Sequence, residues 1–70
     1  MQQYDYSKLN GRIKEYGYTQ ESLSKILGIS ATSLNLSLNN KRNFKQDEIL
    51  KICEILNISN NHLVTYFFTH

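Results

Sequence analysis

The chain has 70 residues, a net charge of +2, no proline and a single cysteine. This length suits one domain, residues 1–70, and one cysteine excludes a disulfide within the chain. Its apolar residues recur at helical spacing, and no apolar run has the length of a membrane span or the character of a signal peptide. We therefore expect a compact all-α domain and a cytoplasmic protein of a bacterial host cell.

Cap residues and helical spacing predict five helices. Asp5 or Ser7 is in position to cap the first, and Thr19, Ser30 and Ser59 stand before the second, third and fifth. The predicted ranges are Tyr6–Tyr16, Gln20–Leu27, Ala31–Asn39, Gln46–Leu56 and Asn60–Tyr66. The run VTYFFT near the end of the chain contains β-forming residues, so strands are the alternative there.

The segment Thr19–Asn39 carries the most specific signal. Gly28 ends its first helix, because glycine tolerates the left-handed backbone that a sharp turn needs. Leu34 and Leu38 form one apolar stripe on its second helix. Two short helices joined by a tight glycine turn form a helix-turn-helix, and the second helix of such a motif can enter the major groove of DNA.

The predicted core consists mainly of the residues on the apolar face of each predicted helix. Cys53 belongs to it as a small buried hydrophobe rather than as a nucleophile or a metal ligand. The core residues are Leu9, Ile13, Leu23, Ile26, Leu27, Ile29, Leu34, Leu38, Phe44, Ile49, Ile52, Cys53, Leu56, Ile58 and Leu63.

An apolar excess remains at the C-terminus, which predicts a homodimer. The predicted dimer interface consists of His62, Val64, Tyr66, Phe67 and Phe68. In the alternative, Tyr66 and Phe67 fold back and seal the core of a monomer.

Positive charge collects around the second helix of the motif. Between Ser22 and Gln46 the only charged residues are Lys25, Lys41, Arg42 and Lys45, and acidic residues follow. Such a distribution suits a surface that faces phosphates. The alternative is that windows this short differ in charge by chance.

No pattern indicates an enzyme. Asp47 and Glu48 are adjacent on a helix and diverge, so they do not form an acid–base pair. His62 and His70 have no cysteine or carboxylate at ligand spacing, which predicts no metal site. We expect no catalytic residue, no cofactor, no small-molecule ligand and no membrane partner.

The run GYTQESLSKILGIS, a short helix ending in NNK and a later helix ending in LKICEILNIS together resemble lambda-repressor-like, or Cro/repressor-type, DNA-binding domains. The match spans about Leu9–Val64. The opening YDYSKLNGRI, the segment FKQDEI and the ending YFF are similar to small phage-encoded Cro-type regulators of Gram-positive hosts. The resemblance implies a five-helix fold and a repressor that binds double-stranded operator DNA as a homodimer.

The resemblance also implies which residues contact DNA. The matched positions would hold phosphates or read bases, and they are Gln20, Ala31, Thr32, Ser33, Asn35, Leu36, Asn39, Lys41, Arg42 and Asn43. Among them, an asparagine such as Asn35 can pair bidentately with adenine, and Leu36 suits a thymine methyl group. The alternative is that these side chains form an ordinary solvated face.

The chain departs from the family's pattern at several positions, among them Ser24, where many members have alanine, and Ser37, where many have an apolar residue. Some members join their first and third helices by a buried Arg–Glu pair, and the matching positions here are Ile13 and Leu38, an apolar replacement. The third helix carries no arginine or glutamine for base readout. An antitoxin or host-type repressor, and a helical protein-interaction module on the same fold, remain the alternative functions.

Overall fold

The computed structural model describes residues 3–70. Its elements are α1 (Ser7–Glu15), α2 (Gln20–Leu27), α3 (Ala31–Leu38), α4 (Gln46–Ile55) and α5 (Leu63–Phe67), with a short 3-10 helix, Asn60–His62, before α5. No strand occurs within residues 3–70, and the run VTYFFT lies largely in α5. The prediction of a compact all-α fold with five helices is therefore confirmed.

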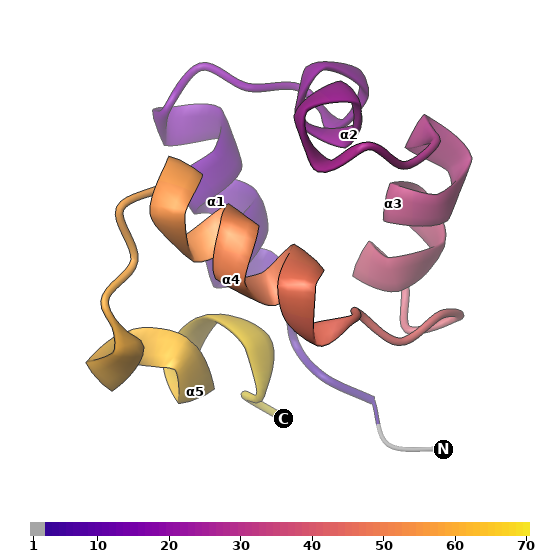
Figure 1. The fold of residues 1–70 in the computed structure, drawn as a ribbon. Coiled ribbons are helices and arrows are strands. Elements are labelled where there is room, and N and C mark those ends of the chain that lie inside the picture. Colours follow the sequence, from indigo (N-terminus) through magenta and orange to yellow (C-terminus); the bar gives the residue numbers. More distant parts are fainter. Residues whose placement is uncertain (1–2) are drawn as a thin grey trace.

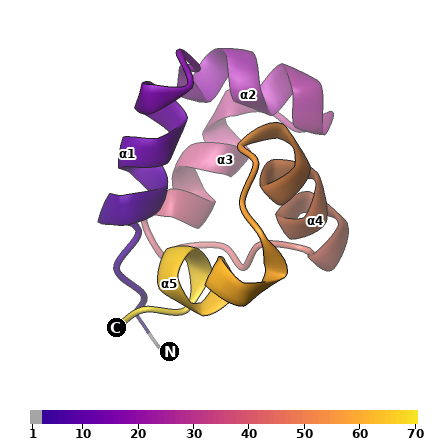
Figure 2. The ribbon, with the colours of Figure 1, turned by 90° about the vertical axis from the view of Figure 1, so that its left-hand side faces the viewer.

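Helix α4 lies on one side of the molecule, opposite α1 (Figure 1, Figure 2). Figure 1 shows α4 crossing the middle of the molecule in front of α1, with α2 and α3 on one side and α5 on the other. The view turned by 90° again places α2 and α5 at opposite ends (Figure 2). The segment before α1 runs beside the end of the chain, where the Asp5 backbone N–H donates to the Thr69 carbonyl oxygen.

The core fills the space between the helices. Its fully buried members come from all five α-helices and include Leu9, Leu23, Leu34, Ile52 and Phe67. The predicted core residues Leu27, Ile29, Phe44, Ile49 and Leu63 are partly buried and pack against it. Ile13 and Leu38 lie in the same buried cluster, as expected if these two apolar side chains replace the buried Arg–Glu pair of other family members.

The prediction for Ile26 is wrong, because its side chain is 43% exposed. The apolar stripe of α2 is centred on Leu23, Ser24 and Leu27, which are buried or half-buried. Successive residues of a helix are about 100° apart around its axis, and this spacing places Ile26 beside the stripe rather than on it.

An aromatic layer closes the α5 end of the core. The ring of Phe44 packs edge-on against Tyr6 and Phe67, with centroid distances of 5.5 and 5.6 Å. Phe67 is 1% exposed, so it is a core residue and not part of a surface for a second copy. Tyr66 is half-buried against the same core. The alternative in which the tail seals the core is therefore correct for these two residues.

Side-chain hydrogen bonds cap the N-termini of α2 and α3. The hydroxyls of Thr19 and Ser30 accept the N3 backbone N–H of α2 and α3, at 3.1 and 3.0 Å, as predicted. Asp5 accepts from the backbone N–H and the hydroxyl of Ser7. Ser59 departs from its predicted role, because its hydroxyl contacts Nδ1 of His62 at 2.9 Å and makes no cap bond.

Candidate functional site

A rigid turn orients α3 relative to α2. Gly28 has a φ of 74°, and the Ile29 N–H donates across the turn to the Ser24 carbonyl at 3.1 Å. Ser30 then caps α3, so hydrogen bonds hold both ends of the three-residue connection between the two helices. Ser24 is buried, and its small side chain donates to the Glu21 carbonyl at 2.7 Å. The exposed face of α3 is therefore held in one orientation on the rest of the domain.

A hydrogen bond between side chains links the two helices at this face. Nδ2 of Asn35 donates to Oε1 of Gln20 at 3.1 Å. Each side-chain amide has two N–H donors and one carbonyl acceptor. Asn35 therefore keeps one N–H and its Oδ1 for another partner, while Gln20 keeps both donors of its Nε2.

The other residues of α3 that are expected to contact DNA lie around Asn35. Ala31, Thr32 and Leu36 are exposed, whereas Ser33 is half-buried and hydrogen-bonded to the Ser30 hydroxyl at 3.0 Å. Asn39 donates through Nδ2 to the Asn35 carbonyl at 2.8 Å. The structure thus brings the polar positions of α3 onto one exposed face, and Ser33 is the least accessible of them.

Ion pairs change the distribution of positive charge that the sequence indicates. Lys25 lies 3.8 Å from Glu21, in an exposed pair that salt screens readily. Arg42 is bound to Glu48, and its distances to the two carboxylate oxygens are 3.0 and 2.8 Å. Lys41 and Lys45 are exposed and form no ion pair within residues 3–70. They are the cations of this surface that remain available to a phosphate.

Arg42 and Glu48 form the centre of a buried polar network. Glu48 is 4% exposed and also accepts the Lys45 backbone N–H at 2.9 Å, while Arg42 donates to the hydroxyl of buried Ser37 at 2.8 Å. The hydrogen bonds from Arg42 lower the pKa of Glu48 despite the opposing effect of burial. The network joins α3, the following loop and α4, so the role of Arg42 in this geometry is to hold the loop that carries Lys41.

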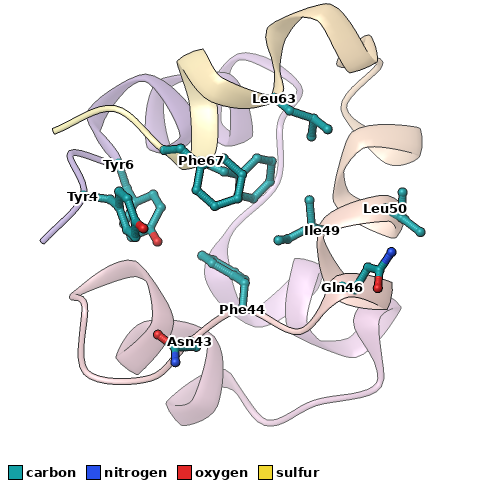
Figure 3. Close-up of a pocket in the computed structure, with 10 residues that line it drawn as sticks. Tyr4, Tyr6, Asn43, Phe44, Gln46, Ile49, Leu50, Leu63 and Phe67 are labelled. Atoms are coloured by element: carbon teal, nitrogen blue, oxygen red, sulfur yellow. The ribbon is translucent and has the colours of Figure 1, made fainter. Parts of the chain in front are cut away.

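A second feature of the surface is an apolar groove at the α5 end. It has a volume of about 550 Å³ and lies between the segment before α1, the loop before α4, α4 itself and α5. Figure 3 shows the side chains that line it, and the packed rings of Phe44 and Phe67 lie among them. Asn43, a predicted DNA ligand, is exposed and lines this groove rather than the face of α3.

The groove depends on how the segment before α1 is anchored. The backbone N–H of Tyr4 donates to Oδ1 of Asn40 at 2.8 Å, and Nδ2 of Asn40 donates back to the Tyr4 carbonyl at 2.8 Å. Asn40 has a φ of 63°, a left-handed conformation that asparagine tolerates better than most residues. This pair fixes Tyr4 and the following Tyr6 beside the loop after α3.

Sequence reasoning missed both the Arg42–Glu48 pair and the groove. Glu48 stands in the first turn of its predicted helix, three residues after Lys45, but nothing in the sequence pattern showed that its side chain is buried.

Within residues 3–70 no group of three potential metal ligands occurs, and no helix is long and apolar enough to cross a membrane.

Comparisons with known proteins identify relatives of the chain. A family model described as "Protein of unknown function (DUF739)" matches residues 2–70. The fold is similar to the solution structure of the modulator of repression (MOR) of the temperate bacteriophage TP901-1 from Lactococcus lactis, with a TM-score of 0.78 and 40% sequence identity. The alignment covers 93% of this chain and 88% of that one. A search of curated proteins found no match.

Proposed function

The chain belongs to the DUF739 family, and on that premise we propose that it is a phage-type regulator of transcription that binds double-stranded operator DNA through α3. Its structural relative is a phage modulator of repression, which favours a regulatory role. In this proposal α2, α3 and the turn between them act as a helix-turn-helix, with α3 in the major groove.

The hydrogen bond from Asn35 to Gln20 is the observation that carries the proposal. It orients an exposed asparagine on α3 and leaves free one N–H and one oxygen, the pair that reads the N7 and N6 edge of adenine. The free Nε2 of Gln20 has donors for a phosphate oxygen. An ordinary solvated face does not require its exposed amides to be braced in this way.

Two cations support the phosphate contacts. Lys41 and Lys45 flank the loop that follows α3, and the Arg42–Glu48 pair holds this loop in place. Arg42 therefore acts indirectly, through the position of Lys41. This division of roles revises the expectation that Arg42 itself contacts DNA.

A homodimer on DNA is part of the proposal. One helix-turn-helix makes few contacts, and two copies would read half-sites about 34–36 Å apart. His62, Val64 and Phe68 are the exposed residues of the predicted interface. The segment 57–70 contains no lysine, arginine or acidic residue, so two copies can meet there without repulsion between formal charges.

A second candidate function is modulation through a protein partner at the same face. It is favoured by the engagement of Arg42 in an ion pair, which reduces the free positive charge, and by the exposed Leu36 on α3. A protein that modulates repression can in principle act on DNA or on another regulator, and binding measurements separate the two.

Selection from a pool of random 30-base-pair duplexes at low salt tests the DNA proposal. We expect an enriched two-fold symmetric site. The Lys41→Ala variant should reduce the slope of log affinity against log salt by about 0.9, because one phosphate contact is lost. Asn35→Ala should reduce discrimination between the selected and a scrambled duplex by about 1–3 kcal/mol.

Matched variants control this experiment. Lys51→Ala removes an exposed cation on α4 and should leave the salt slope unchanged, while Val64→Asp should weaken binding to the symmetric site without changing the fold. If the folded protein enriches no duplex, the DNA proposal fails and the protein-partner candidate is favoured.

A further inference from the structure

A polar groove lies at the corner where the chain passes from α1 into α2 (Figure 2). This α1–α2 groove has a volume of about 480 Å³ and is lined by Asn10, Ile13, Lys14, Tyr18, Thr19 and Gln20. Ile13 is its one aliphatic residue and is buried, while the other lining residues have polar side chains. Lys14 is the only charged residue among them. The lining therefore offers one positive charge and no negative charge.

Several polar groups of the groove are available to a ligand. The side chains of Asn10 and Tyr18 form no hydrogen bond with residues 3–70, and Nε2 of Gln20 forms none either. Each carries at least one N–H or O–H donor. In the same part of the chain, no sealed side-chain nitrogen or oxygen lacks a partner, so these donors are accessible from outside.

The positive charge of Lys14 is also available. Its side chain is exposed and forms no ion pair within residues 3–70. The neighbouring acids in the sequence are Glu15 and Glu21, and each lies 3.8 Å from a cation other than Lys14. Lys14 therefore differs from the cations near it, because no carboxylate offsets its charge.

Gln20 joins this groove to the exposed face of α3. It lines the groove, and its Oε1 accepts a hydrogen bond from Asn35 of α3 at 3.1 Å. A ligand in the groove therefore lies next to whatever α3 contacts. A helix in the major groove of DNA is flanked by sugar–phosphate strands, and lysine, asparagine, glutamine and tyrosine side chains commonly bind their phosphates.

We propose that the α1–α2 groove holds a backbone phosphate of the bound duplex, with Lys14 as its cation and the amides of Asn10 and Gln20 as donors to its oxygens. The inference rests on the proposed binding of DNA through α3. One cation matches the single charge of a phosphodiester, and the apolar Ile13 suits the carbon atoms of the adjoining deoxyribose. The groove lies on the α2 side of α3, whereas Lys41 lies on the loop that follows α3, so the two cations would contact different phosphates.

Such a contact sets affinity and position rather than sequence choice. The test measures affinity for the selected and the scrambled duplex by fluorescence anisotropy over a range of salt concentrations. Lys14→Ala should reduce the slope of log affinity against log salt by about 0.9, because one phosphate contact is lost. It should weaken both duplexes by the same factor, so that discrimination between them is unchanged. Lys14→Arg keeps the charge and should keep the slope of the parent.

Lys8→Ala is the matched control, since Lys8 is an exposed lysine of the same helix outside the groove. It should leave the slope unchanged, and circular dichroism of all variants should match that of the parent. Ethylation interference then locates the contact. Ethylating one phosphate in each half-site should weaken binding of the parent and have no effect on Lys14→Ala.

The outcomes separate this inference from the proposed function. If the folded protein binds neither duplex, both fail. If Lys41→Ala and Asn35→Ala have their expected effects but Lys14→Ala keeps the slope of the parent, or if Lys8→Ala lowers the slope as much, the inference alone is overturned. It is also overturned if inorganic phosphate saturates the groove in an NMR titration while Lys14→Ala binds DNA like the parent, because the groove is then a site for a free anion.

Discussion

The two exposed faces of this protein differ in what holds their side chains in place. On the α2–α3 face, hydrogen bonds join residues that are close in the sequence, such as Thr19 to Ser22 and Ser30 to Ser33, and only Asn35 to Gln20 spans two helices. On the groove face, Tyr6, Phe44 and Phe67 meet from three distant segments.

Because of this difference, the stability of the protein should respond differently to substitutions on the two faces. A face built from caps and a turn depends on local conformational preferences, each contributing about 1 kcal/mol. A face built from aromatic packing depends on the whole fold, because each ring is positioned by the others. Substitutions in the groove wall should therefore destabilise the protein more than substitutions in the turn.

The largest effect is expected at Phe67. Phe67→Ala should lower the free energy of unfolding by about 3–5 kcal/mol, since it removes a fully buried ring from a small core. Its neighbour Phe68 is exposed, so Phe68→Ala should cost much less. Urea unfolding followed by circular dichroism measures both. Equal losses in the two variants would contradict the assignment of Phe67 to the core.

A smaller effect is expected at the network that connects the two faces. Arg42→Met should cost about 2–3 kcal/mol, because it leaves the buried carboxylate of Glu48 without its main partner. The double variant Arg42→Met/Glu48→Leu should recover most of this loss, since both charges are then absent. Thermal unfolding of the parent, the single and the double variant measures the coupling. A double variant that is less stable than Arg42→Met would show that the pair is not the source of the loss.

The smallest loss of stability is expected for a substitution in the turn between α2 and α3. Gly28→Ala should cost about 1–2 kcal/mol, because a φ of 74° is strained for a residue with a side chain. No neighbour lies within 4 Å of the added Cβ, so strain is the only cost. Gly11, inside α1, has equally open surroundings, and Gly11→Ala should stabilise the protein by up to about 1 kcal/mol. The same urea measurement checks both, and a loss at both positions would point to crowding instead of backbone strain.

The helices and the turn were predictable because their signals are local. Thr19 and Ser30 as caps, and Gly28 as the stop of α2, follow from residue preferences within one turn of helix. The candidate α3 face could be predicted for the same reason, since the positions around Asn35 lie on the side of α3 opposite its buried leucines. The error at Ile26 shows the limit of this reasoning, because an eight-residue helix leaves the centre of its apolar stripe ambiguous.

By itself, the sequence determined that this protein is all-α, where its first four helices begin and end to within about a residue, and which face of α3 is polar, because backbone preferences and helical spacing act over a few residues. The predicted helix Asn60–Tyr66 is instead a 3-10 helix, Asn60–His62, followed by α5. Only the tertiary structure decided that Arg42 binds Glu48, that Phe67 seals the core and that an apolar groove forms beside Tyr6. Each of these outcomes depends on which distant segments meet, and on whether water is excluded where they do. Charge, aromatic character and hydrogen-bonding capacity can be read from the chain, but burial decides whether they serve stability or remain available to a partner.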